Sequence, residues 1–326
     1  MTGLYERATA AALISSGRSL LLAGDEKLLA ALPKGDWIGG TIPYFMAAEG
    51  GLQTAERVFI TELPQGARTT IRRYDAASLQ NIAADHPGHG FTVLLIPAFS
   101  DAHAEYAKNV AHYPGIFDRP IVGWISGIAL EQIGTVVPKT FDGASGAGSS
   151  DHAVAVHVEL PERDEVSVEI INLFQPGDGD AITFADSSFS VTDALVNAKQ
   201  TNFAKYLTER EIDTRLPLVA DYNGAMINVS IQKVDAAAGT VDFYAPVFPE
   251  INYHVAAPVD DYVANFAAHL HTGSEPAFAC NCILNYVYAG LEGRSTAPLF
   301  GPMTFGEIAY MLLNQTAVWL TVTSNN

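Results

Sequence analysis

Basic residues are scarce in this chain. Its 326 residues include 18 Lys and Arg against 36 Asp and Glu, which gives a formal net charge of −18 at pH 7. A protein of that charge repels phosphate backbones, so we expect no nucleic-acid partner. Charged residues of both signs make up only 17% of the chain, which is low for a soluble protein. That deficit indicates extensive buried surface, or a homo-oligomer that covers part of it.

Cysteines and long apolar runs are also rare. Cys280 and Cys282 are the only cysteines, and one intervening residue leaves them badly placed for a structural disulfide. Free thiols favour a reducing compartment. No apolar run reaches the ~18 residues that a membrane helix needs, and residues 1–7 lack the pattern of a signal peptide. We therefore expect a cytoplasmic protein with no membrane partner.

Hydrophobic residues are plentiful, at 48%, and the length suits two domains. In the first half, apolar strand patterns alternate with polar helix patterns, which predicts parallel βαβ units. Expected strands are 20–23, 37–42, 58–63, 69–74, 91–97 and 120–126, and expected helices are 4–15, 25–32, 76–84 and 102–111.

The second half has a different pattern. Its expected strands follow one another through tight turns, which is typical of antiparallel sheets. The expected strands are 152–160, 166–174, 181–184, 189–191, 216–222, 225–234, 240–245, 251–256 and 278–282. Helices are expected at 192–211, 259–270 and from Thr304 onward. The glycine- and serine-rich stretch 142–151 marks a boundary. The prediction is an α/β protein of two packed lobes with mixed sheets, 1–150 and 151–326, the second richer in antiparallel strands.

Two distant segments end a strand in glycines beside a hydroxyl: Asp36–Ile42, with Gly39, Gly40 and Thr41, and Phe300–Glu307. Glycine allows another group to approach the backbone closely, so such ends suit ligand binding. Thr304 and Glu307, three residues apart, also match the capping box of a helix N-terminus.

The cysteine pair admits several interpretations. At positions i and i+2 of a strand, Cys280 and Cys282 point to one face, where they would bind a metal, react with an electrophile, form a redox pair, or simply pack. A nucleophilic cysteine needs a histidine base, and His254 is the histidine to watch, since a strand-borne histidine also suits a heme iron. No histidine or cysteine spacing typical of a metal site is present. Nucleotide-binding glycine patterns and GxSxG elbows are absent as well.

These same segments resemble the FIST family of small-molecule-sensing signal-transduction modules. Trp37–Thr41 is similar to the family's glycine and hydroxyl strand end, and Phe91–Trp124 to its next strand–helix–strand unit. Ala279–Cys282 stands where the family has a small or cysteine-containing strand, and Gly301–Ile308 resembles its closing motif. Ile283 replaces the basic residue that the family has after the cysteine strand. The chain thus resembles a divergent, stand-alone member.

The resemblance implies a sensory protein that binds a small molecule between its lobes and signals to a separate partner protein. Family members bind small molecules such as amino acids, and some bind heme, although no cofactor is predicted here. The residues expected to line the site are Gly39, Gly40, Thr41, Trp124 and Ser126 on one wall, and Asn223, Tyr253, His254, Cys280, Cys282, Thr304, Gly306 and Glu307 on the other. The alternatives are a cysteine-dependent transferase or hydrolase that uses Cys280 or Cys282 with His254, and a heme-based gas sensor.

Overall fold

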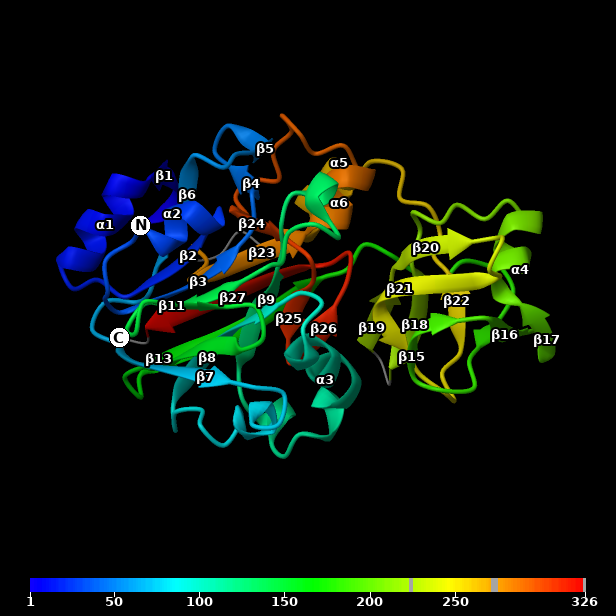
Figure 1. Cartoon of the computed structure of the whole chain (residues 1–326), viewed down its shortest axis with the longest axis horizontal. Helices are drawn as coiled ribbons and strands as arrows, with labels where there is room; N and C mark the ends of the chain where they lie inside the picture. The colour runs from blue at the N-terminus through cyan, green and yellow to red at the C-terminus, as the bar shows by residue number, and fades with distance from the viewer. Residues whose placement is uncertain (223–224, 271–274, 325–326) are drawn as a thin grey trace.

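The computed structural model describes residues 1–222, 225–270 and 275–324. The chain forms a large and a small lobe that lie side by side (Figure 1). The large lobe combines both ends of the sequence, and the small lobe holds the strands from Ile182 to Val255. The predicted α/β fold of two lobes with mixed sheets is confirmed.

One sheet of the large lobe comes entirely from the first half of the chain. Its strand order is β1-β6-β2-β3-β10-β11, and β2 and β3 run parallel, joined through α2. Apolar side chains on one face pack beneath α1 and α2, with Leu20, Leu22 and Trp37 in that cluster. The elements are β1 (Thr2–Glu6), α1 (Arg7–Ser15), β2 (Leu20–Gly24), α2 (Glu26–Ala30), β3 (Trp37–Thr41), β6 (Arg57–Glu62), β10 (Thr140–Asp142) and β11 (Ala147–Ser149).

A second sheet crosses the centre of the large lobe in the order β26-β25-β9-β8-β12-β7. β8 and β9 are buried along their whole length and run parallel, as their continuous apolar runs predict. Ser100 caps the connecting helix α3, since its Oγ accepts a bond from the backbone N–H of His103 at 3.1 Å. This βαβ unit confirms the predicted one. The elements are β7 (Arg68–Tyr74), β8 (Gly90–Pro97), α3 (Asp101–Asn109), β9 (Ile121–Ser126), β12 (Ala153–Glu159), β25 (Glu307–Ala309) and β26 (Met311–Leu313).

The third sheet joins strands from opposite ends of the sequence, in the order β13-β27-β23-β24-β4-β5. β24 pairs with β4, and in the central sheet β25 pairs with β9. Strand pairing therefore crosses the expected boundary at residue 150, and one core serves all three sheets. The elements are β4 (Tyr44–Ala47), β5 (Gly50–Gln53), β13 (Asp164–Ile171), α5 (Tyr262–His269), β23 (Phe278–Cys282), α6 (Ile283–Tyr288), β24 (Gly301–Thr304) and β27 (Ala317–Ser324).

The small lobe has a core of its own, built around Phe184, Phe203, Phe243 and Tyr253. One sheet has the order β17-β16-β14-β22-β18-β19, and the other β15-β21-β20. The elements are β14 (Ile182–Thr183), β15 (Ser188–Val191), β16 (Asp193–Val196), β17 (Lys199–Asn202), α4 (Phe203–Glu209), β18 (Leu218–Tyr222), β19 (Ala225–Val229), β20 (Ile231–Asp235), β21 (Thr240–Val247) and β22 (Tyr253–Val255).

Two predicted helices are wrong, and a third is right only in part. Within the predicted helix 192–211, residues 193–202 form the hairpin β16–β17, and only Phe203–Glu209 is helical, as α4. The segment after Thr304 consists of strands, so Thr304 and Glu307 lie in β24 and β25 and form no capping box. Residues 76–84 contain only a single 3₁₀ turn, Leu79–Asn81.

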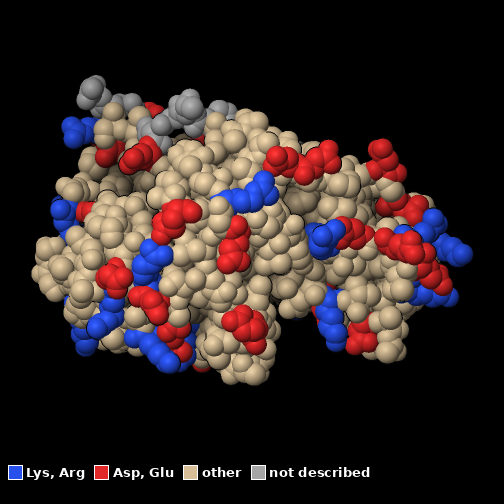
Figure 2. All heavy atoms as spheres, turned by 90° about the horizontal axis from the view of Figure 1, so that it is seen from above, with Lys and Arg blue, Asp and Glu red and all other residues tan. Residues whose placement is uncertain are grey.

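Seen from above, acidic and basic side chains form small scattered groups on a mostly uncharged surface (Figure 2). Within the described ranges, every helix is too short or too polar to cross a bilayer.

Candidate functional site

Both glycine-tipped segments lie against the same strand, β9, inside the large lobe. Gly40 on β3 faces β9 so closely that a Cβ atom there would lie 2.5 Å from Ser126 Oγ and 2.9 Å from Trp124 Nε1. Within its own sheet β9 pairs with β25, where Glu307 is the register partner of Trp124. The backbone of Gly306 accepts a bond from the N–H of Ile125 at 2.8 Å. Glycine at position 40 is thus explained by close approach to protein.

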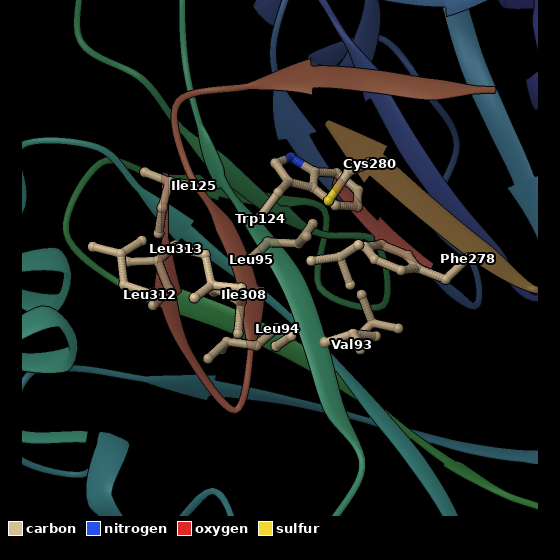
Figure 3. Packing of buried hydrophobic residues seen from close by; sticks show 14 of the residues in the cluster. Val93, Leu94, Leu95, Trp124, Ile125, Phe278, Cys280, Ile308, Leu312 and Leu313 are labelled. Carbon is tan, nitrogen blue, oxygen red and sulfur yellow. The ribbon is translucent and has the colours of Figure 1, made fainter. Parts of the chain in front are cut away.

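The cysteine strand joins the same region. Cys280 Sγ lies 3.5 Å from the carbonyl oxygen of Gly123, and the ring of Trp124 stacks on Phe278 with centroids 5.9 Å apart. Figure 3 shows Cys280, Trp124 and Phe278 within the packed apolar interior. The sequence therefore brings the predicted residues of β3, β9, β23, β24 and β25 together, but as a packed core. Thr41 borders a cleft that Lys27 and Glu131 also line.

Glu307 is the most unusual member of this core, because it is an acidic residue and yet is fully buried. Its Oε2 accepts two bonds from Thr316, from the backbone N–H at 3.2 Å and from Oγ at 2.8 Å. Thr304 Oγ lies 3.4 Å from the other oxygen, Oε1. Burial raises the pKa of Glu307 to about 8 despite these bonds, so the side chain is mainly a neutral carboxylic acid at pH 7.

The same burial makes the thiols poor nucleophiles. Cys280 and Cys282 have 0% and 1% of their surface exposed. Burial first, and then the neighbouring Glu307, raises the pKa of both thiols well above the ordinary value. A thiolate is the reactive form of cysteine, so this geometry does not favour the cysteine-dependent enzyme.

The remaining predicted residues lie elsewhere. Tyr253 and His254 are on β22 of the small lobe. The Tyr253 hydroxyl lies 2.8 Å from that of Tyr222 and accepts a bond from the N–H of Phe248 at 3.0 Å. His254 Nδ1 lies 3.1 Å from the carbonyl of Gly179. Asn223 falls outside the described residues. The expected second wall is thus divided between the two lobes.

A polar cleft opens where the lobes meet, with a volume of about 510 Å³. We call it the junction cleft. Residues from the small-lobe side and from α5, α6 and their flanking loops line it: Phe174, Asp213, Arg215, Leu216, Pro258, Val259, Asp260, Asp261, Tyr262, Asn285, Tyr288, Ala289, Arg294 and Gln315. A cleft of this size suits a small organic ligand.

Asn285 forms part of this cleft and has only 2% of its surface exposed. Its Nδ2 donates to Asn281 Oδ1 at 2.9 Å and to the carbonyl of Thr316 at 3.4 Å. Its Oδ1 has no hydrogen-bond partner among the described residues. A buried polar atom without a partner is costly, by about 1–3 kcal/mol. The sequence signal was a single amide within the otherwise apolar or aromatic helix Ile283–Tyr288.

Charges of both signs line the junction cleft in two ion pairs. Arg215 Nη2 lies 2.6 Å from Asp213 on the small-lobe side, and Arg294 Nη2 lies 3.3 Å from Asp261 on the large-lobe side. Hydrogen bonding from Arg215 lowers the pKa of Asp213. Asp260 adds a further carboxylate. The cleft can therefore bind a molecule that carries both a cationic and an anionic group.

Gln315 joins the two lobes beside the cleft. Its Oε1 accepts a bond from Ser230 Oγ at 2.7 Å, and its Nε2 donates to the carbonyl of Arg215 at 3.1 Å. Its neighbour Thr316 is bonded to both Glu307 and Asn285. A continuous run of buried polar groups thus connects the neutral Glu307 to the cleft.

In the parts of the chain that the structure describes, no three histidine, cysteine or acidic side chains are grouped to hold a metal ion. No curated protein matches the chain. A family model described as a family of unknown function (DUF6976) matches residues 5–323, and the chain therefore belongs to that family.

Proposed function

We propose that this protein is a ligand-binding sensor of intracellular signal transduction, acting in the cytoplasm, which binds a small molecule in the junction cleft. One observation carries the proposal: the unpartnered, buried Oδ1 of Asn285 in a cleft whose walls come from both lobes. The resemblance to the FIST family points to the same class of function and stays a prediction.

The lining residues favour a small polar ligand with an N–H donor and charges of both signs, as in a free amino acid. Asn285 Oδ1 accepts from the ligand, Asp260 attracts its ammonium group, and the Arg215 or Arg294 guanidinium binds its carboxylate in a bidentate fork. The polar group that satisfies Asn285 removes an energetic cost of the empty site.

Signalling follows from the position of the cleft. A ligand that contacts Arg215 and Arg294 together favours one relative position of the lobes, and a ligand shifts such an equilibrium by its differential affinity for the two positions. The chain passes this shift to a separate partner protein through its surface, either as a monomer or as a homo-oligomer.

Native mass spectrometry of the protein as isolated tests whether a small molecule is retained. The protein is then unfolded to release any retained molecule and refolded. Titration calorimetry of the refolded protein, with the free amino acids as probes, tests the ligand class. We expect at least one amino acid to bind, and Asn285→Leu to weaken that binding at least tenfold, because the acceptor is lost. Asn109→Leu, on the exposed surface of α3, is the matched control and leaves the affinity unchanged. If no amino acid binds, or if both variants bind like the parent, the assignment of the junction cleft is wrong.

A further inference from the structure

A second cleft lies between the lobes and has a different character from the junction cleft. Its volume is about 370 Å³, and we call it the aromatic cleft. The large lobe contributes the turn between β8 and α3 together with Phe305, and the small lobe contributes β15, β20 and β21. The lining residues are Ala98, Phe99, Ser100, His103, Ala104, Phe189, Ser190, Gln232, Asp242, Phe243, Tyr244 and Phe305.

The position of the aromatic cleft is one where α/β proteins bind ligands. β8 and β9 are parallel, and their carboxyl ends are Pro97 and Ser126. Ala98 and Phe99 follow β8 directly, so the cleft opens at the carboxyl end of the parallel pair. Open α/β sheets bind their ligands outside this end of the strands.

Phe99 occupies the strand-to-helix turn in an unfavourable conformation. Its φ is 66°, in the left-handed region, although it is not glycine, and such a residue costs about 1–3 kcal/mol. The residue is 54% exposed, and its ring meets that of Phe305 edge to face, with centroids 6.2 Å apart. The backbone thus holds a large apolar ring at the cleft instead of burying it in the core, and strain of this kind is concentrated at functional sites.

His103 supplies the polar group of the aromatic cleft. The backbone N–H of Phe99 donates to its Nδ1 at 3.3 Å. An Nδ1 that accepts a hydrogen bond carries no proton, so in the neutral ring the proton is on Nε2. Burial lowers the pKa of His103 to about 4, which keeps the ring neutral at pH 7. The result is one N–H donor of defined position.

That donor has no partner. Nε2 of His103 makes no hydrogen bond with any described residue, and the side chain is 8% exposed. The ring of Phe189, from the small lobe, lies 6.1 Å from the His103 ring. Aromatic surfaces therefore surround a single buried, unpartnered N–H at the lobe boundary.

We infer that the aromatic cleft binds a neutral, planar aromatic molecule that carries a hydrogen-bond acceptor, with its ring between Phe99 and Phe189 and its acceptor on Nε2 of His103. The ring contacts are edge-to-face or offset, as aromatic side chains prefer. The acceptor removes the cost of the unpartnered N–H. This site shares no lining residue with the junction cleft. Its test is therefore independent of the test of the proposed function.

Quinoline and naphthalene are a matched pair of probes, because they share a shape and only quinoline has an acceptor nitrogen. We expect quinoline to bind about tenfold more tightly than naphthalene at pH 7, as one hydrogen bond to a buried donor provides. In protein labelled with ¹⁵N-histidine, quinoline moves the Nε2 resonance of His103 and naphthalene leaves it nearly unchanged.

Two variants separate the donor from the rings. His103→Phe keeps an aromatic ring but no donor, and the preference for quinoline falls to about one. Phe189→Ala weakens both probes at least threefold and leaves the turn at Phe99 intact, which covers the case that His103→Phe does not fold. Phe117→Ala is the control, since Phe117 is 57% exposed and lies outside the cleft lining. Equal affinity for the two probes, no binding of either, or binding unaffected by Phe189→Ala overturns the inference.

Discussion

Thr316 donates both its backbone N–H and its hydroxyl to the same oxygen of Glu307, at 3.2 and 2.8 Å, inside the core of the large lobe. Two donors to one oxygen are not enough to keep the group ionised, because burial outweighs them and raises the pKa of Glu307 to about 8. Thr304 Oγ lies 3.4 Å from the other oxygen, Oε1, so each oxygen of the carboxyl group has a partner.

The raised pKa of Glu307 predicts a stability that depends on pH. The native state binds this proton more tightly than the unfolded chain, whose value is 4.5. The contribution of this proton to the stability of the folded state is complete below about pH 4.5 and is lost as the pH rises through about 8. Glu307→Gln, a neutral side chain of the same shape, is therefore expected to raise the free energy of unfolding by roughly 3 kcal/mol at pH 7.

Urea denaturation at pH 5, 7 and 8.5 checks this prediction. The gain from Glu307→Gln is smallest at pH 5 and largest at pH 8.5. Glu162→Gln, at an exposed position, is the control and shows no comparable trend. A variant that is less stable than the parent at pH 8.5 would mean that the carboxylate, and not the acid, is the native form.

Gly40 tests how closely β3 approaches β9. A Cβ atom at this position would lie 2.5 Å from Ser126 Oγ, so Gly40→Ala forces the two strands apart. We expect a loss of about 1–3 kcal/mol, as for other overpacked cores. Gly88→Ala is the control, because a Cβ atom there meets nothing within 4 Å. Thermal denaturation measures the unfolding midpoints of both variants. Equal midpoints would show that the core beside Ser126 accommodates a methyl group at position 40.

The sequence predicts the βαβ units well because their signals are local and agree with each other. Residues 91–97 form a continuous apolar run, and Ser100 stands where a helix cap belongs. The capping-box reading of Thr304 and Glu307 is wrong because pairing with β4 and β9 decides the conformation there. Tertiary strand pairing of this kind overrides a local cap motif.

The first half of the predicted helix 192–211 is wrong for a different reason, although Phe203–Glu209 is helical. β16 and β17 are joined by Asn197 and Ala198, with φ values of 48° and 64°, the pattern of a type I′ hairpin turn. Asparagine suits that turn, but alanine rarely adopts a positive φ, so the sequence carries no clear hairpin signal.

The candidate site was only partly predictable. Gly40, Trp124 and Glu307 were expected to converge, and the structure shows that they do so through β9. These residues form a packed core and do not line a cleft, because side chains from three sheets fill the space between them. The sequence does not show how those volumes fit together. Asn285 and His103 were missed, because an unpartnered atom is visible only once its surroundings are known.

The cysteines are expected to be unreactive in the native protein. Both are buried beside Glu307, and the pKa of each thiol is well above its ordinary value. A thiol reagent such as 5,5′-dithiobis(2-nitrobenzoic acid) at pH 7.5 should label neither cysteine in the time in which guanidinium-unfolded protein reacts completely. Rapid labelling of one thiol in the native state, lost in His254→Ala, would instead support the cysteine-dependent enzyme.

Gln315 is expected to hold the lobes together at the junction cleft. It adopts a left-handed backbone, with φ of 50°, and its amide bonds to Ser230 and Arg215 from the small-lobe side. Gln315→Ala removes both bonds and leaves Ser230 Oγ buried without a partner. Because each such loss costs about 1 kcal/mol, we expect faster amide hydrogen exchange around residues 228–232 and at 215–217.

Gln200→Ala, on exposed β17, is the control and should leave these rates unchanged. Unaltered exchange in Gln315→Ala would show that the lobe junction depends on other contacts, such as the bonds of Asn228 to Asn172 and to the Asn314 carbonyl, each at 3.0 Å.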